Sequence, residues 1–385
     1  MGTISSREIY CCNKKYIKDQ DVDLDKTLRT QKSLNKITLI QSKFRSFILR
    51  KKKYHIDGVK TIPIDYNTDS YETNPLITRL DNLLPKFEFN EGEEYYIKHC
   101  PYKLKGLLYP NKYIYKGMIN FRNLREGYGK LYFPDGTIYK GFFRNNKMEG
   151  RGRLLSINGY IYEGDFKNNL SNGYGKYVSL DGTSYTGNWK DDKQSGIGDI
   201  IYPDGSRFRG NFLYGKKNGF GKMVFQDQNV YEGNFENNKI DGEGVYHWKD
   251  GRAYSGNWEN NKMSGYGIFK WPDKKKYYGH YNDNLKEGFG IFYWEDGHSY
   301  EGFWKNGKQN GYGIIKNNNS ENGYKYGMWD LGRFSYEVEE IKELEKIDDM
   351  IDKEKQSKEY KDFQKNIENY EKKIRVDSSS IETKE

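Results

Sequence analysis

The 385-residue sequence contains only three cysteines and eight prolines. Three cysteines are too few for a disulfide framework. No run of about 18 apolar residues exists, so no segment is expected to cross a bilayer as a helix. The N-terminus also lacks the roughly 7–15-residue apolar core of a secretory signal peptide. These absences favour a protein of the reducing cytosol, whose membrane contact would come from attached lipid or surface charge.

Aliphatic side chains are also scarce. Hydrophobic residues make up 35% of the chain, and the mean hydropathy is −1.03. A thick core cannot be filled from so little Leu, Ile and Val, so the 36 Tyr, 20 Phe and 7 Trp must supply most of the buried apolar surface. The net charge of +9 is spread widely, with one basic block at residues 43–53. No nucleic-acid-binding module accompanies it, and no nucleic-acid partner is expected.

Residues for catalysis are missing as well. The carboxylates of the repeats are expected at turns and surface positions rather than in acid–base pairs. The histidines have no metal-ligand spacing: His55, His99, His247, His280 and His298. The sequence therefore predicts a protein that is not an enzyme and has no metal site and no cofactor.

What the chain does contain is a repeat. The pattern Tyr-x-Gly-x-aromatic recurs at a spacing of 24 residues once and 23 residues thereafter, starting at Tyr115, Tyr139, Tyr162, Tyr185, Phe208, Tyr231, Tyr254, Tyr277 and Tyr300. A Gly-x-Gly follows each start, and Asp-Gly or Asn-Gly precedes most of them. Self-similarity at one fixed period indicates an array of identical supersecondary units.

Each unit reads as one β-hairpin. Alternation with period two puts both aromatic residues and the glycine between them on one strand face, where the glycine is expected to leave room for a ring from a neighbouring unit. Asp-Gly and Asn-Gly accept positive φ and indicate tight turns. One hairpin is barely stable alone, so stacking must bury the aromatic faces. At two strands per unit, the array would extend by about 10 Å per repeat.

These units resemble MORN repeats (membrane occupation and recognition nexus), and the resemblance covers residues 101–333 as about nine full repeats with degenerate ends. It implies a mainly β fold: an elongated, twisted, single-layer antiparallel array of β-hairpins, here flanked by an N-terminal amphipathic helix and a C-terminal helix. It also implies roles in tethering membranes, organising the cell cortex and forming homodimers.

The flexible N-terminus, residues 1–24, carries a dual-acylation signal. Gly2 after Met1, with Ser6, fits the N-myristoylation pattern. One myristoyl chain gives only marginal membrane binding, on the order of 10⁴ M⁻¹, so stable attachment takes a second signal. Cys11 and Cys12 are the predicted palmitoylation sites that would supply it. The alternative is an unmodified N-terminus.

Residues 25–54 have the periodicity of an amphipathic helix. Within this helix a segment resembles an IQ motif, with Ser46 where glycine is usual; its residues are Ile40, Gln41, Phe44, Arg45 and Arg50. Such a helix lays its apolar face into the groove of calmodulin or a related EF-hand light chain. The alternative is a basic helix lying on anionic lipid, and calcium-loaded calmodulin would then lift it off the membrane.

The remaining segments are read from composition. Residues 55–100 are expected to form an irregular linker. Residues 334–375 predict a charged amphipathic helix, which either forms a short coiled coil or folds back to cap the last hairpin. Residues 376–385 are expected to be disordered.

The favoured function is a lipid-anchored scaffold on the cytosolic face of the plasma membrane or of an underlying cortical membrane complex. It would organise cortical cytoskeleton or membrane-complex proteins and so cell shape. The alternatives are a calcium- and calmodulin-linked adaptor and the regulatory subunit of a separately encoded enzyme.

Overall fold

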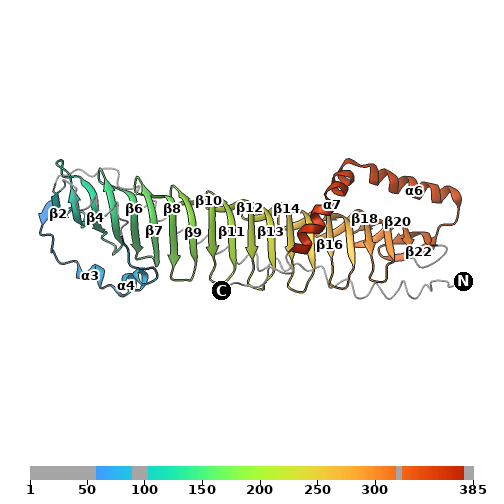
Figure 1. The fold of residues 1–385 in the computed structure, drawn as a ribbon, viewed down its shortest axis with the longest axis horizontal. Coiled ribbons are helices and arrows are strands. Elements are labelled where there is room, and N and C mark those ends of the chain that lie inside the picture. The colour runs from blue at the N-terminus through green and yellow to red at the C-terminus, as the bar shows by residue number, and fades with distance from the viewer. Residues whose placement is uncertain (1–57, 89–102, 318–322, 377–385) are drawn as a thin grey trace. The chain divides into compact units, whose positions relative to one another are not determined.

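The computed structural model of the chain describes residues 58–88, 103–317 and 323–376. Its strands belong to one open 22-stranded antiparallel sheet. The chain divides into two compact units between Asn218 and Gly219. We call the described residues 58–218 the first unit and 219–376 the second unit. Within each unit, every strand pairs with the strand that follows it in sequence, as the consecutive arrows of Figure 1 show. The predicted hairpin array is confirmed.

The first unit starts with a short strand and two short helices that precede the repeats. Its elements are β1 (Lys60–Ile62), α3 (Asp69–Glu72), α4 (Pro75–Asp81), β2 (Lys103–Leu108), β3 (Ile114–Ile119), β4 (Arg125–Tyr132), β5 (Ile138–Arg144), β6 (Lys147–Ser156), β7 (Tyr160–Lys167), β8 (Leu170–Ser179), β9 (Ser184–Lys190), β10 (Lys193–Ile201) and β11 (Arg207–Leu213). The division between the units falls within β12 (Lys216–Val224).

The second unit continues the hairpins and ends in two helices. Its further elements are β13 (Val230–Glu236), β14 (Lys239–His247), β15 (Ala253–Glu259), β16 (Lys262–Lys270), β17 (Lys276–Asn282), β18 (Leu285–Tyr293), β19 (Ser299–Lys305), β20 (Lys308–Lys316), β21 (Tyr324–Asp330), β22 (Arg333–Glu337), α6 (Ile341–Gln356) and α7 (Lys358–Val376).

Two-residue turns that end in Asn tie their hairpins to the ones before them. Both turn residues take positive φ, as at Asn145 (47°) and Asn146 (66°), which suits a two-residue turn between twisted strands. Asn146 then donates its backbone N–H to the carbonyl of Arg125 in the preceding repeat (3.0 Å). Its side-chain Oδ1 accepts the N–H of the same arginine (2.7 Å). Asn284 repeats both bonds with Met263. The second turn residue therefore clamps successive repeats together.

The first tyrosine of each repeat lies over a pair of glycines. A Cβ on Gly141 or Gly152, which face each other on β5 and β6, would come 2.5 or 2.4 Å from the Oη atom of Tyr139. That hydroxyl passes over the glycines and donates to the carbonyl of Phe142 (2.9 Å). The expectation that the glycine admits a ring from a neighbouring unit was therefore wrong, because the ring comes from the same repeat, two residues earlier.

The aromatic rings then pack edge to face along the array. The Tyr139 ring lies 5.1 Å from Phe143 of its own repeat and 5.1 Å from Phe166 of the next. In the second unit, Tyr277 makes the same contact with Trp304 of the next repeat at 5.2 Å. We call this the ring face of the sheet. Its rings cover one another, and each such contact contributes about 1 kcal/mol beyond its buried area.

Lys286 is an exception on the ring face. It holds the place that Met148 and Met263 take in other repeats, and it is buried among four rings, those of Trp271, Tyr277, Phe292 and Trp304. Burial lowers the pKa of its ammonium to about 7. Cation–π attraction offsets part of the cost of burying the charge.

Replacing Lys286 with Met is expected to stabilise the second unit by about 2 kcal/mol below pH 7. The folded pKa lies below the unfolded value of 10.5, so the unfolded state binds more protons between pH 7 and 10.5 and the wild type gains stability as the pH rises through this window. The advantage of the variant should therefore shrink towards pH 10. Thermal unfolding at pH 6 and pH 9 measures this, with Lys262→Met as control, because Lys262 is partly exposed and keeps an ordinary ion pair with Asp283. A variant no more stable than wild type at pH 6 would contradict the burial cost.

Part of the segment predicted as an irregular linker, residues 55–100, is ordered, so that expectation was wrong for residues 58–88. β1 pairs with β2 and extends the sheet. α4 begins at Pro75, whose fixed φ suits a first helical turn, and Asn74 caps it by accepting the N–H of Leu76 (3.0 Å). Ile77 and Leu80, three residues apart, are the buried side of this helix.

The single helix predicted for residues 334–375 is also wrong in detail. Residues up to Glu337 still belong to β22, and the helical part is divided into α6 and α7. The division falls at Ser357, whose ψ of 148° is extended. Its hydroxyl accepts the N–H of Tyr360 (3.2 Å) and so caps the start of α7. Residues 377–385 of the predicted disordered tail lie outside the described residues.

Candidate interaction face

The side of the sheet opposite the ring face, which we call the second face, carries the alternate residues of every strand. In the hairpin of β15 and β16, for example, Tyr254 and Phe269 pair on the ring face, and Ser255 and Ile268 pair on the second face. The middle residue of each Gly-x-Gly also lies there, because its glycines belong to the ring face. These middle residues vary from repeat to repeat, which makes the second face the place where the repeats differ.

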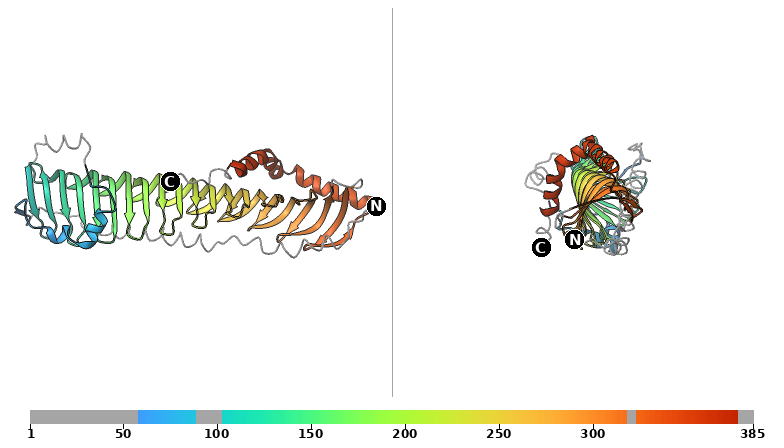
Figure 2. Two further views of the ribbon diagram at one scale, coloured as in Figure 1. Left: turned by 60° about the horizontal axis from the view of Figure 1, so that its bottom comes forward. Right: turned by 90° about the vertical axis from the view of Figure 1, so that its right-hand side faces the viewer.

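In the first unit, α3 and α4 cover part of the second face. Ile77, Leu80 and Leu84 form one buried cluster with sheet residues that include Ile138 and Ile161. Figure 2 shows both helices lying against the strands of this end of the unit. The cover therefore rests on an apolar cluster, and its edges are charged.

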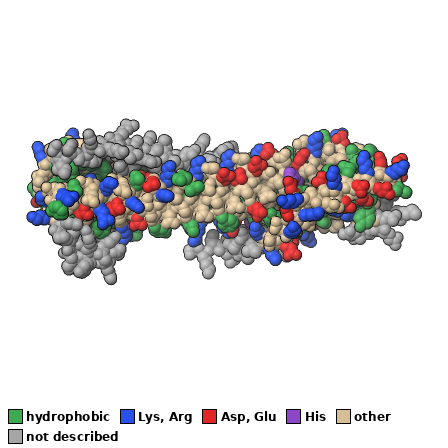
Figure 3. Space-filling view, turned by 90° about the horizontal axis from the view of Figure 1, so that it is seen from above, with side chains coloured by type: hydrophobic (Ala, Val, Ile, Leu, Met, Phe, Trp, Pro, Cys, Tyr) green, Lys and Arg blue, Asp and Glu red, His purple; other side chains and the backbone are tan. Residues whose placement is uncertain are grey.

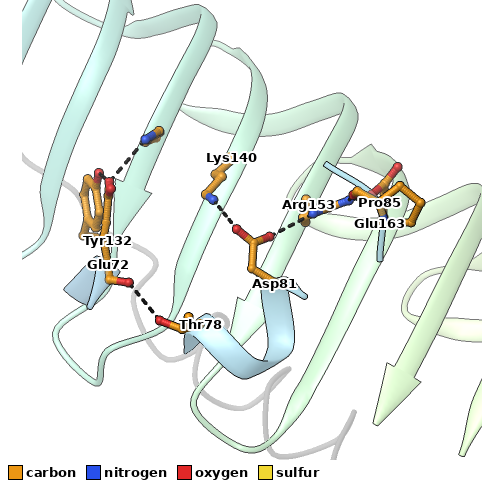
Figure 4. A network of polar contacts seen from close by, with 9 residues as sticks. Glu72, Thr78, Asp81, Pro85, Tyr132, Lys140, Arg153 and Glu163 are labelled. Atoms are coloured by element: carbon orange, nitrogen blue, oxygen red, sulfur yellow. Dashed lines mark hydrogen bonds and ion pairs between the residues drawn. The ribbon is translucent and has the colours of Figure 1, made fainter. Parts of the chain in front are cut away.

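An ion network fixes α4 on the sheet (Figure 4). Arg153 on β6 is 2% exposed and donates to Asp81 Oδ1 (2.8 Å) and through Nε to Glu163 Oε2 (2.8 Å). It also donates to the carbonyl of Pro85. Lys140 donates to the other oxygen of Asp81 (2.9 Å). Burial alone would raise the pKa of Asp81, but the hydrogen bonds from Lys140 and Arg153 outweigh it and lower the pKa.

In the second unit, α6 and α7 fold back over the second face, and α7 crosses the strands in Figure 1. The fold-back alternative is therefore the one observed, and the helices cover several hairpins rather than capping only the last. Phe363 of α7 stacks on Tyr266 with ring centroids 5.2 Å apart. Tyr360 packs its ring against Phe289 (5.5 Å). Ile347 and Ile351 of α6 are buried in the same cluster.

Buried and partly buried charges hold α6 and α7 in place. Glu301 on β19 is buried and forms ion pairs with Lys316 and with Lys355 of α6. Burial would raise the pKa of this carboxyl, but the hydrogen bonds from the two lysines outweigh it and lower the pKa. On α7, Tyr370 donates to Glu243 Oε1 (3.4 Å).

Beyond α3 and α4, the first unit leaves apolar side chains of the second face exposed. Tyr174 on β8 is 61% exposed and Ile197 on β10 is 64% exposed. Both are middle residues of a Gly-x-Gly. Ile201, at the end of β10, is 41% exposed. Exposed apolar side chains that gather on one face make that face a candidate for binding another chain.

The described surface otherwise carries mixed charge. Figure 3 shows Lys and Arg side chains interspersed with Asp and Glu on the side seen from above. Across the three described ranges, no three His, Cys, Asp or Glu side chains gather as a metal site would require. No helix in those ranges is both long and apolar enough to span a bilayer.

The residues singled out from the sequence for lipidation and calmodulin binding lie outside the described residues. They are Gly2, Cys11, Cys12, Ile40, Gln41, Phe44, Arg45 and Arg50. Sequence reasoning missed the second face as a site, and with it Arg153. The sequence did contain a signal for this face. The middle residue of Gly-x-Gly is often apolar, although its position faces away from the ring face.

Comparison with known families places the repeats. The MORN-repeat family model matches residues 121–138, 139–159, 162–184, 185–207, 208–230, 231–251, 254–276, 277–299 and 300–320. These segments make up slightly more than half of the chain, which therefore belongs to the MORN-repeat family. MORN repeats are typically found in membrane-associated or cytoskeletal scaffold proteins. No curated protein sequence matches the chain.

Among solved structures, the chain is similar to the TCP10 domain of Danio rerio CPAP in complex with a peptide of Danio rerio STIL. The identity is 10% and the TM-score 0.32, over 62% of this chain and 96% of that chain. It is also similar to the SAS-4 (dCPAP) TCP domain of Drosophila melanogaster in complex with a proline-rich motif of Ana2. There the identity is 15% and the TM-score 0.27, over 52% of this chain and 99% of that chain.

Proposed function

We propose that the protein is a non-catalytic scaffold anchored by lipid to the cytosolic face of the plasma membrane or of an underlying cortical membrane complex. There it organises cortical cytoskeleton or membrane-complex proteins and so cell shape. The observation that carries this proposal is the coincidence in one chain of an array of MORN repeats with Gly2, Ser6, Cys11 and Cys12 at the N-terminus.

Two acyl chains would be needed to hold the protein stably at a membrane. A myristoyl group on Gly2 would hold the protein at a membrane only transiently, whereas palmitoylation of Cys11 or Cys12 would add the second anchor that stable attachment takes. The repeats supply the protein-binding part, because stacked hairpins give a long row of surface positions rather than a pocket.

The IQ-like segment supports a second role. Ile40, Gln41 and Phe44 would enter the groove of an EF-hand protein, with Arg45 and Arg50 outside it. If this basic helix also touches anionic lipid, then calcium-loaded calmodulin competes with the membrane for it. The third alternative is that the protein is the regulatory subunit of a separately encoded enzyme. Co-purification of an enzyme with the chain would favour this alternative.

Fractionation of cells expressing the tagged full-length chain tests the anchor. The Gly2→Ala variant is expected to move from the membrane pellet to the soluble fraction, because it loses the myristoylation site. Thr3→Ala is the matched control and should stay with the membranes. A Gly2→Ala protein that stays in the pellet would refute the acyl anchor.

A calmodulin pull-down tests the IQ-like segment. Calcium-loaded calmodulin should bind the wild type and not an Ile40→Ala/Gln41→Ala variant. Equal binding of both proteins would show that these residues do not form the calmodulin site.

A further inference from the structure

The exposed part of the second face repeats a position that the chain itself covers elsewhere. Tyr174 and Ile197 are middle residues of a Gly-x-Gly, as are Tyr266 and Phe289. The latter two are 8% and 1% exposed because α7 packs against them. We call Tyr174, Ile197 and Ile201 the bare row. Its first two residues occupy the same backbone positions, in the same kind of hairpin, without the helix, and Ile201 lies beside them at the end of β10.

α7 fits its part of the sheet because the rise of seven helical residues matches the width of one repeat. Phe363 stacks on Tyr266, and Tyr370, seven residues further along the helix, reaches Glu243. Tyr266 and Glu243 are 23 residues apart, which is one repeat. Two strand spacings amount to about 10 Å, and seven helical residues rise about 10.5 Å. A helix lying across the strands therefore brings every seventh residue over the same position of successive repeats.

The bare row offers this spacing again. Tyr174 on β8 and Ile197 on β10 are also 23 residues apart, with β9 between them. An amphipathic helix with apolar residues seven apart would place one of them on Tyr174 and the next on Ile197. The helix residue three or four positions after the first would lie between these two contacts. The row also adjoins the apolar cluster under α4, because Val178 of β8 packs at the edge of that cluster. A helix on the bare row would therefore continue an existing interface.

Charge decides which kind of helix fits. Lys176 and Arg209 are exposed on the same face. The carboxylates nearby are engaged within the fold. Asp165 accepts the N–H of Tyr174 (3.1 Å). Asp199 stands on the same face between Ile197 and Ile201, but its charge is paired with Arg207. The row is therefore apolar, with an excess of exposed basic side chains around it. The basic segment 25–54 of this chain would meet like charge here.

We propose that the bare row binds an amphipathic helix of a partner protein, with apolar residues at a seven-residue spacing and acidic residues beside them. The helix lies across β8–β10 as α7 lies across β14–β16. This interaction is independent of the lipid anchor, because it needs neither Gly2 nor the cysteines.

The probe is a fluorescein-labelled synthetic peptide with the sequence of residues 358–376, made acidic beside its apolar face by Gln364→Glu, Asn366→Asp and Lys373→Glu. The matched control peptide keeps the same apolar face and carries Gln364→Lys and Asn366→Lys beside it. Fluorescence anisotropy with the purified full chain measures binding. We expect the acidic peptide to bind at least tenfold more tightly than the basic one.

Variants of the full chain locate the site. Tyr174→Asp/Ile197→Asp should weaken binding of the acidic peptide at least tenfold, and both residues are exposed enough for the fold to tolerate the change. Lys176→Glu/Arg209→Glu should weaken the acidic peptide at least fivefold and strengthen the basic one. Tyr214→Asp, an exposed tyrosine in the turn between β11 and β12, is the control and should leave binding unchanged.

The outcomes separate the occupants. Loss of binding in both double variants supports the proposal. Unchanged binding in both would overturn it, because the peptide would then be displacing α7 or binding elsewhere. If neither peptide binds the full chain, the proposal is also overturned. Sedimentation in which the wild type is a dimer and Tyr174→Asp/Ile197→Asp a monomer would assign the row to a second copy of the chain instead.

Discussion

Replacing Gly244 with Ala is expected to lower the free energy of unfolding around β13 and β14 by about 3 kcal/mol, through overpacking against a buried ring. The new Cβ would lie 2.2 Å from Oη and 2.4 Å from Cζ of Tyr231. Tyr231 is fully buried and donates its hydroxyl to the carbonyl of Asn234 (3.0 Å), so the ring cannot move aside without losing that bond.

Hydrogen exchange of the amides around each substitution is the suitable measurement, because stability in a repeat array is local. These are the amides of β13 and β14 for Gly244 and of β18 and β19 for the control. Gly297→Ala is the control. Gly297 has a φ of +91°, and a Cβ added there would meet nothing within 4 Å, so the change should cost only the roughly 1 kcal/mol of an unfavourable backbone conformation. In a Tyr231→Ala background, Gly244→Ala should cost much less. Equal losses for the two glycines would show that the ring does not lie over Gly244.

Arg153→Ala is expected to cost about 3 kcal/mol, in the range for breaking a buried ion pair. It removes the side chain that joins Asp81 of α4, Glu163 of β7 and the carbonyl of Pro85. The backbone pairings of β5, β6 and β7 do not depend on this side chain, so the sheet itself should persist. Of the ion pairs to Asp81 only that of Lys140 would remain, so α4 should loosen.

Two readouts distinguish this loosening from general unfolding. Amide exchange in α4 should accelerate while that of β9 and β10 stays unchanged. The depressed pKa of Asp81 contributes stability above its ordinary value of 3.8, which is lost as the pH falls through the folded pKa. Losing Arg153 should therefore raise the pH at which α4 is released in acid. Lys130→Ala, which removes an exposed pair with Glu72, should cost below about 0.5 kcal/mol. An unchanged α4 in Arg153→Ala would refute the anchoring role.

The repeats were predictable from sequence because each signal is local. The spacing of the tyrosines, the Gly-x-Gly and the turn dipeptides act within a single hairpin, and sequential pairing then follows. The same pattern did not reveal which ring fills the space over Gly141. A tyrosine two residues before a glycine on the same strand face can lie over it or point to a neighbour, and only the bond to the carbonyl of Phe142 decides this.

The packing of helices on the second face could not be predicted from the sequence, for a different reason. The 3-4 spacing of Tyr360, Phe363, Ile367 and Tyr370 predicts an apolar helix side, but it is equally satisfied by a coiled coil or by the sheet. α4 is seven residues long and gives a weaker signal still. Arg153 stands in the sequence as one charged residue among many, and its burial depends on residues 68 to 72 positions earlier in the chain.

The turn clamp has a consequence for how such a chain is made and how it evolves. Asn146 bonds back to Arg125, and Asn284 to Met263, over the same 21 residues. Each new hairpin thus finds the partners of its turn clamp in chain that has already left the ribosome. For the same reason, loss or duplication of one 23-residue segment in the gene would join equivalent strands and leave all the remaining pairings in register, so that the number of repeats can change without a new fold having to arise.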